Sequence, residues 1–298
     1  MDKIPLHVMF NHSHYIPQTL CHCKELFSEW VIVPEVYPDL LYSYYGILDY
    51  CTSIKEFVQF FSRTDMNKMP HFFSIENIRL ISDVNELSSL KNLGICAIQL
   101  YHHSDSEFFN RITGITEKGM RLLSVMLDNN IALDLSHLND DWCLKILRIF
   151  SGKIQLSHCA VSELLDAPYR RSNAISIRTM EKLVAHDSLI GICFVNDIVG
   201  KNENELDEEK LYIDIVQQFE FIGRRLGCNN FCLGPDFLDF QYYSKIFSKK
   251  LLIPECFFTA SGYVKLFCDL STAFGQVAAF NILWSNAHQW YTEIHNSR

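Results

Sequence analysis

Residues 131–158 read IALDLSHLNDDWCLKILRIFSGKIQLSH, and two short apolar runs in this stretch each end in Ser-His. The runs, Ile131–Leu135 and Lys153–Leu156, show little polar alternation, which is typical of strands that are buried on both faces. Between them, Asp140–Phe150 has the apolar spacing of an amphipathic helix. A strand, a helix and a second strand in this order predict a parallel βαβ unit.

The same unit recurs along the chain. Eight apolar runs of four to seven residues are predicted as strands: Leu6–Phe10, Trp30–Val33, His71–Ile75, Ile95–Leu100, Ile131–Leu135, Lys153–Leu156, Leu189–Val195 and Asn230–Leu233. Eight strands that alternate with helices predict an α/β fold, a single (β/α)8 TIM-type barrel. A doubly wound open sheet is the alternative, but no Gly-x-Gly-x-x-Gly turn follows the first run, which favours the barrel.

Two helices can be delimited from their ends. Glu117–Asn129 begins after Thr116, a good N-cap residue, and its expected buried face is formed by Met120, Leu123 and Leu127. Leu206–Leu226 is a longer helical pattern, and Gly227 after it suits a helix C-terminus.

No segment rich in Pro, Gly and Ser interrupts the chain, so we expect one barrel domain over residues 1–298. Helices at about 260–295 are expected to pack on the barrel. Within them, Ala273–Tyr291 is apolar and contains Trp284 and Trp290, which predicts a helix against the barrel; a homodimer surface is the alternative. The acidic run Glu203–Glu209 is interpreted as a solvated loop, with a lid over the barrel mouth as the alternative.

Composition excludes several classes of function. The 298 residues are 48% hydrophobic, enough for a large core, and carry a net charge of −9, which argues against a nucleic-acid partner. No apolar stretch is long enough for a membrane span, and Met1–His14 does not have the pattern of a secretory signal. The 11 cysteines form no Cys-x-x-Cys pair, so we expect a reducing cytoplasm. Cys21-His22-Cys23 fits either a metal site or the polar start of a helix.

Metal-ligating side chains follow six of the predicted strands. They are His12 and His14, Glu76, His102, His137, His158 and Asp236. In a barrel the carboxyl ends of all strands meet at one mouth, so these side chains are expected to converge. Imidazoles and carboxylates are ligands of Zn²⁺ and related divalent ions. Two metals that share one hydroxide and polarise a carbonyl are suited to amide hydrolysis.

The same segments carry a family resemblance. Residues 114–119 (GITEKG) and 132–137 (ALDLSH) are similar to segments of the membrane (renal) dipeptidase family of metallopeptidases, within the amidohydrolase-type barrels. Further similar segments are Phe73–Asn77, Leu156–His158 with the Arg-Arg-Ser-Asn of residues 170–173, and Gly234–Asp239. The chain resembles this family in consistent order from about residue 70 to 240, with a weaker anchor at the N-terminus.

The resemblance implies a role for each matched residue. Glu76 would bridge two zinc ions, His137 and His158 would complete the shell of the second, and His12 would serve the first. His14 is a further candidate ligand on its own spacing, because residues two apart on an extended strand point to the same face. Asp236 would be the catalytic, proton-handling carboxylate. His102 and Arg171, with Arg170 as the fallback of the Arg-Arg pair, would bind the substrate. A guanidinium suits the terminal carboxylate of a peptide, because it can donate two parallel hydrogen bonds.

At three positions the chain departs from the family pattern, which limits how far the family's residue roles can be assigned to it. His14 stands where the family has an aspartate, which removes one negative charge and leaves the identity and number of the metals open. Val195 stands where the family often has an aromatic residue. Leu238 displaces the second aspartate of the family's Asp-Phe-Asp to Asp239.

The leading hypothesis is therefore a zinc-dependent hydrolase that cleaves the amide bond of a dipeptide or short peptide-like substrate through a metal-bridging hydroxide. A tailoring enzyme that acts on a modified peptide or natural product is the first alternative. A non-catalytic barrel that binds a partner is the second, and the retained ligand set argues against it.

Overall fold

The computed structural model describes residues 4–11, 27–33, 71–76, 78–81, 83–92, 94–102, 105–166, 173–201, 207–236 and 251–296. Its strands are β1 Ile4–Asn11, β2 Phe27–Val33, β3 His71–Ile75, β4 Ile95–Gln99, β5 Phe109–Asn110, β6 Gly114–Ile115, β7 Ala132–Asp134, β8 Ile154–Val161, β9 Ala174–Ile175, β10 Leu189–Ile192 and β11 Phe231–Leu233. Its helices are α4 Leu87–Asn92, α5 Glu117–Asp128, α6 Asp140–Ile146, α7 Ile177–Ala185, α8 Asn196–Val199, α9 Glu208–Leu226, α11 Ala260–Phe274, α12 Gln276–Phe280 and α13 Asn286–Asn296.

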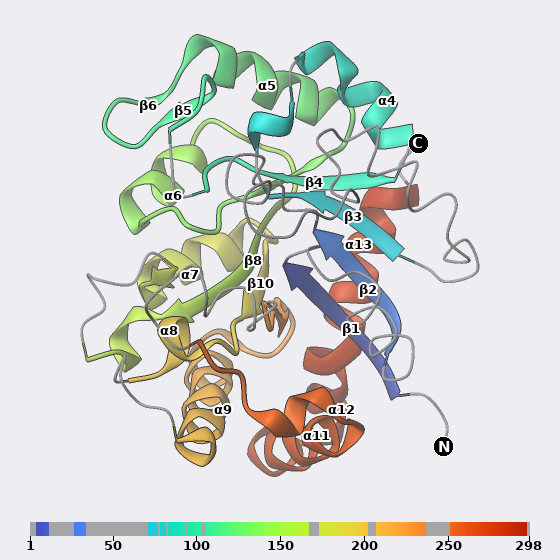
Figure 1. The fold of residues 1–298 in the computed structure, drawn as a ribbon, viewed down its shortest axis with the longest axis vertical. Helices are drawn as coiled ribbons and strands as arrows, with labels where there is room; N and C mark the ends of the chain where they lie inside the picture. The colour runs from blue at the N-terminus through green and yellow to red at the C-terminus, as the bar shows by residue number, and fades with distance from the viewer. Residues whose placement is uncertain are drawn as a thin grey trace, which may run out of the picture.

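Eight strands form one parallel sheet in the order β1-β2-β3-β4-β7-β8-β10-β11, and β9 pairs with the far end of β8. All eight correspond to the predicted apolar runs. Because the order follows the sequence, the doubly wound alternative, in which the strand order reverses, is excluded. Figure 1 shows the strands at the centre and helices outside them, and Cα atoms of β1 and β11 come within 8 Å of each other. The predicted α/β fold of the TIM-barrel type is confirmed.

The core fills the space inside the sheet and between the sheet and the helices. The residues of β4, β7, β8, β10 and β11 are all buried, as expected of strands covered on both faces. Both predicted helix ends are confirmed: the Thr116 side chain accepts a hydrogen bond from the Gly119 N–H, and Gly227 follows α9 with φ of +79°.

Three predicted details are wrong. The buried face of α5 consists of Gly119, Leu122, Leu123 and Met126, whereas Met120 and Leu127 are each 46% exposed. Strand β8 does not end at Leu156 but continues to Val161, because the following apolar residues are also buried and pair with β9 and β10. The segment Ala273–Tyr291 is not one helix, because Gly275, with φ of +86°, separates α11 from α12.

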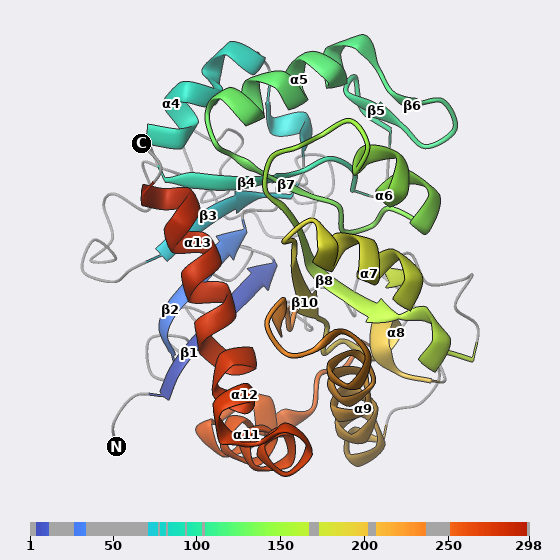
Figure 2. The same ribbon diagram turned by 180° about the vertical axis from the view of Figure 1, so that it is seen from behind.

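Helix α13 lies across the sheet on the side seen in Figure 2. Its Ala287, Trp290, Tyr291 and Ile294 share a buried cluster with residues at or near the starts of four strands: Cys96, Ala97, Ala132, Leu189 and Cys232. The helix therefore covers the end of the barrel where the strands begin, opposite the end where the predicted site residues lie. In the part of the chain that the structure describes, no helix has the length and apolar character needed to span a bilayer.

Candidate metal centre

The site is built at or near the carboxyl ends of five parallel strands. Glu76 directly follows β3, His102 follows β4 by three residues, and His137 follows β7 by three. His158 lies within β8, and Asp236 follows β11 by three residues. All five side chains are buried or nearly so in a mouth that the parallel arrangement of the strands creates.

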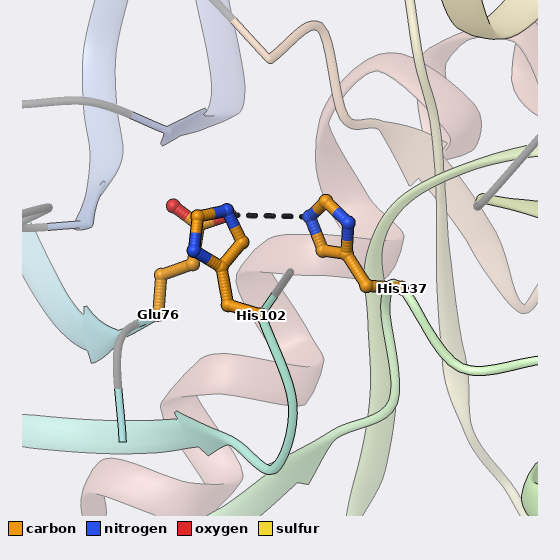
Figure 3. A group of neighbouring side chains, drawn as sticks. All are labelled: Glu76, His102 and His137. Atoms are coloured by element: carbon orange, nitrogen blue, oxygen red, sulfur yellow. Dashed lines mark ion pairs between the residues drawn. The ribbon is translucent and has the colours of Figure 1, made fainter. Parts of the chain in front are cut away.

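Three of these residues form a group capable of holding a metal. Glu76, His102 and His137 each offer a ligand atom, and these atoms all lie within 4.8 Å of one another. The Glu76 Oε1 atom is 3.6 Å from His102 Nε2 and 3.5 Å from His137 Nε2. Figure 3 shows the three side chains pointing toward one another from three separate strand ends.

His158 extends this group through His137. The two Nε2 atoms are 3.1 Å apart, and the rings meet edge to face at 4.9 Å between centroids. The His102 and His137 rings are also edge to face, at 4.7 Å. Three imidazoles and one carboxylate therefore converge, with their Nε2 atoms directed inward.

The backbone at two site residues has an uncommon conformation. His137 has φ of +67° and Asp236 has φ of +55°, a region that few residues other than glycine adopt. The side-chain oxygen of Asn173 accepts a hydrogen bond of 2.7 Å from the His137 N–H, which holds this turn in place. Non-glycine residues in this region are concentrated at functional sites, where the surrounding structure holds them.

Asp236 is brought in by a close approach of two strand ends. A Cβ atom at Gly234 would overlap the Ser157 carbonyl oxygen and lie 2.9 Å from the backbone of Gly191. Only glycine fits between β8 and β10 at this point. Asp236, two residues further on, is buried with φ of +55° and lies close enough to Glu76 to raise its pKa.

The electrostatics of the site favour a cation. Burial raises the pKa of Glu76 well above its ordinary value, and the nearby carboxylates of Asp236 and Asp134 raise it further. A divalent ion bound beside Glu76 would favour the charged form of this carboxylate. The donor set, carboxylate plus imidazole in convergent positions, fits zinc or a similar metal.

Five of the predicted site residues lie in the described part of the chain. The structure brings together Glu76, His102, His137 and His158, and it positions Asp236 close enough to influence Glu76. His102, which the resemblance assigns to the substrate, lies within the metal-capable group itself. The remaining predicted residues, His12, His14, Arg170 and Arg171, lie outside the described residues, as do Cys21–Cys23, Leu238 and Asp239.

Sequence reasoning missed the residues that support the ligands. Asn173 was part of a matched motif but had no assigned role. Asp134, Ser136 and Ser157 were also inside matched segments, where their side chains now prove to be buried and hydrogen-bonded. Gln155 carried no signal, because a single glutamine inside an apolar run has no characteristic spacing.

Comparisons with known proteins identify the family of this chain. Residues 40–255 match the model of the family described as membrane dipeptidase, peptidase family M19. A search of curated proteins finds no significant match.

Among solved structures, three illustrate the likeness. An amidohydrolase from Pseudomonas aeruginosa aligns with 12% identity and a TM-score of 0.69, over 98% of this chain and 95% of that one. A metallopeptidase from Rhodobacter sphaeroides, liganded with a phosphinate mimic of the dipeptide L-Ala-D-Ala, aligns with 14% identity and a TM-score of 0.69, over 98% and 99%. A Burkholderia multivorans amidohydrolase with bound zinc aligns with 10% identity and a TM-score of 0.56, over 96% and 97%.

Proposed function

The chain belongs to the membrane dipeptidase family, peptidase family M19, and from this premise we propose that it cleaves the amide bond of a dipeptide or short peptide-like substrate. Membership of the family makes it a metal-dependent hydrolase. The observation that carries the proposal is the convergence of Glu76, His102, His137 and His158 at adjacent strand ends.

We propose that the cofactor is two Zn²⁺ ions. Glu76 would contribute to both ions, because a carboxylate has two oxygens, and His137 and His158 would hold one of them through Nε2. His12 and His14 would hold the other. When bound, the metal polarises the scissile carbonyl and lowers the pKa of water.

Asp236 is the group that moves the proton in this proposal. Its carboxylate accepts a proton from the attacking water and returns it to the nitrogen of the leaving amine, so the proton balance closes within one turnover. Burial of Asp236 supports this role, because proton transfer in a water-poor pocket is shielded from exchange with solvent.

His102 and Arg171 would bind the substrate. His102 lies at the mouth of the site, 3.6 Å from Glu76, within reach of a carbonyl oxygen presented beside that carboxylate. Arg171, or Arg170 in its place, would bind the terminal carboxylate of the peptide with two parallel hydrogen bonds. The partner is thus a small peptide rather than a macromolecule.

The test is hydrolysis of a dipeptide panel by protein that has been stripped with a chelator and reloaded with Zn²⁺, Mn²⁺ or Co²⁺. The panel should include L-Ala-D-Ala and L-Ala-L-Ala, because they share composition and differ only in stereochemistry. We expect hydrolysis that depends on added metal. Metal binding with no hydrolysis of any dipeptide would contradict the dipeptide substrate and favour a modified peptide, and absence of both would favour a non-catalytic barrel.

The role of Asp236 can be separated from metal binding. Asp236→Asn keeps a residue type that tolerates positive φ, and it should lower kcat by about 10²–10⁴-fold, the usual contribution of a general acid or base. The matched control is Asp187→Asn, since Asp187 also has positive φ (58°) but pairs with Lys153 at the surface. Equal activity of the two variants would rule out the proton-handling role.

A further inference from the structure

A line of hydrogen bonds runs through the inside of the barrel from the C-terminal helix to the metal-capable group. Its members are Tyr291 on α13, Gln155, Asp134, Ser136, Ser157 and His158, and each is between 0% and 3% exposed. None of them except His158 has been given a role in the proposed chemistry.

The end near the metal centre consists of two serines and a histidine. The Ser157 Oγ atom is 2.9 Å from His158 Nδ1 and 3.0 Å from Ser136 Oγ. For His158 to coordinate a metal through Nε2, its proton must lie on Nδ1, and that N–H then donates to Ser157 Oγ. The Ser157 hydroxyl in turn donates to Ser136. The serine pair therefore accommodates the tautomer that binds metal and fixes the plane of the ring.

In the middle of the line, the Asp134 carboxylate accepts hydrogen bonds from the backbone N–H groups of both serines. Asp134 Oδ1 accepts hydrogen bonds from the Ser136 N–H at 2.9 Å and from the Ser157 N–H at 3.2 Å. Asp134 Oδ2 accepts a bond of 3.0 Å from Gln155 Nε2. This geometry links the end of β7 to the middle of β8, the strands that position His137 and His158.

The far end is a tyrosine that determines how Gln155 is oriented. The Tyr291 hydroxyl donates to Gln155 Oε1 at 2.5 Å. Because Asp134 can only accept from Gln155, the amide has one orientation, with Nε2 toward Asp134 and Oε1 toward Tyr291. Burial raises the pKa of Tyr291 well above its ordinary value, so the hydroxyl stays a donor.

We infer that Tyr291 is a positioning residue for the metal ligand His158, acting through Gln155, Asp134 and the pair Ser136 and Ser157. The inference rests on the proposed function, because it concerns a metal bound at His158 Nε2. It assigns the C-terminal helix a part in the active site although that helix lies at the opposite end of the barrel. Removing one member of such a buried hydrogen-bond network costs free energy, because the polar atom next to it then loses its partner.

The experiment measures Zn²⁺ affinity of chelator-stripped protein, by competition with a coloured chelator, for the wild type, Tyr291→Phe and Ser157→Ala. Ser157→Ala removes the direct partner of the ligand and should weaken binding by about 10–100-fold. Tyr291→Phe acts at a distance and should weaken it by a smaller, several-fold factor. The absorption spectrum of the Co²⁺-loaded protein, which reports ligand geometry, should change in both variants.

The matched control is Tyr212→Phe. Tyr212 is a buried tyrosine whose hydroxyl donates to Asp269 at 2.7 Å on the outer helices α9 and α11. It should lower the melting temperature, as Tyr291→Phe should, but leave Zn²⁺ affinity and the Co²⁺ spectrum unchanged.

The outcomes separate the inference from the proposed function. A wild-type protein that binds no Zn²⁺ overturns the proposed function and the inference with it. Wild-type binding with unchanged affinity and spectrum in Tyr291→Phe, at a melting temperature lowered as in the control, overturns the inference alone. If Tyr291→Phe does not fold, Ser157→Ala tests the inference. A Zn²⁺ affinity of Ser157→Ala equal to that of the wild type would overturn the inference, because it requires Ser157 to position His158.

Discussion

Glu76 carries a charge that the folded chain disfavours in the absence of metal. Its pKa is raised by burial first, and then by Asp236 and Asp134, so the metal-free fold holds its proton more tightly than the unfolded chain does. Below about pH 4, near the ordinary pKa of glutamate, both states are protonated and stability is fully present. As pH rises toward the folded pKa, only the unfolded chain releases the proton, and stability falls.

The first prediction follows from that sign. In chelator-stripped protein, Glu76→Gln should match the wild type at about pH 4, since glutamine resembles protonated glutamate, and should melt at a higher temperature at pH 8. Each unit of pKa shift corresponds to about 1.4 kcal/mol of stability. Thermal melts at the two pH values check it, with the exposed Glu86→Gln as control. A stability difference that is the same at both pH values would contradict the assigned cause.

The same substitution should have the opposite effect once metal is added. Glu76→Gln should lower metal occupancy more than replacement of any single histidine, because a bridging carboxylate serves both ions. Elemental analysis of metal-replete protein measures this. Retention of two metals per chain in Glu76→Gln would show that Glu76 is not the bridge.

His14 lies outside the described residues, and its role stays a prediction. If it ligates the first metal as a neutral imidazole, affinity should fall as acid protonates the ring. An aspartate stays ionised to lower pH, so His14→Asp should strengthen first-site binding under mildly acidic conditions. Metal titrations of both proteins at two pH values decide it. Equal affinities at the lower pH would argue that His14 is not a ligand.

At the scale of elements, the position of Asp236 depends on how closely β11 approaches β8. In Gly234→Ala the new methyl group would overlap the Ser157 carbonyl oxygen and the backbone of Gly191. Both are backbone groups that cannot rotate away, so β8 and β10 would have to shift. Overpacking of this kind costs about 1–3 kcal/mol, and here it also displaces the residue before His158.

Gly234→Ala should therefore lower both stability and Zn²⁺ affinity. Gly227→Ala is the control: no atom lies within 4 Å of a Cβ there, and only its φ of +79° disfavours alanine. With ψ of −176°, Gly227 adopts a conformation that is essentially restricted to glycine, so that control should lose about 1–3 kcal/mol of stability and keep its metal affinity. Urea unfolding and Zn²⁺ titration compare the two. Wild-type affinity in Gly234→Ala would show that the strand approach does not position the site.

Elements could be predicted from the sequence where burial alone decides them. All eight main strands follow from apolar runs, but the buried face of α5 does not, because its apolar residues form a stripe wider than the face that is buried. What determines the face is Gly119, where a Cβ would collide with the Phe108 carbonyl. A contact between a helix and the loop before β5 leaves no periodic signal.

At the scale of the whole molecule, the sequence predicts the residues of the site better than it predicts the buried residues that hydrogen-bond to them. Glu76, His102, His137 and His158 each lie at or near the end of an apolar run, and the barrel topology makes such ends converge. Tyr291 is 136 residues from Gln155, and nothing in an aromatic-rich helix indicates which side chain reaches the barrel interior. The homodimer and the cytoplasmic location stay predictions.

The central claim is that Glu76, His137 and His158 bind a divalent metal. The most direct test is the zinc content per chain, after dialysis against Zn²⁺ and then against metal-free buffer, of the wild type and His137→Asn. Asparagine suits the positive φ of residue 137, and His186→Asn, at the C-terminus of α7, is the control. The account predicts at least one retained zinc in the wild type and control and a marked loss in His137→Asn. No zinc in the wild type, or equal zinc in all three proteins, would contradict it.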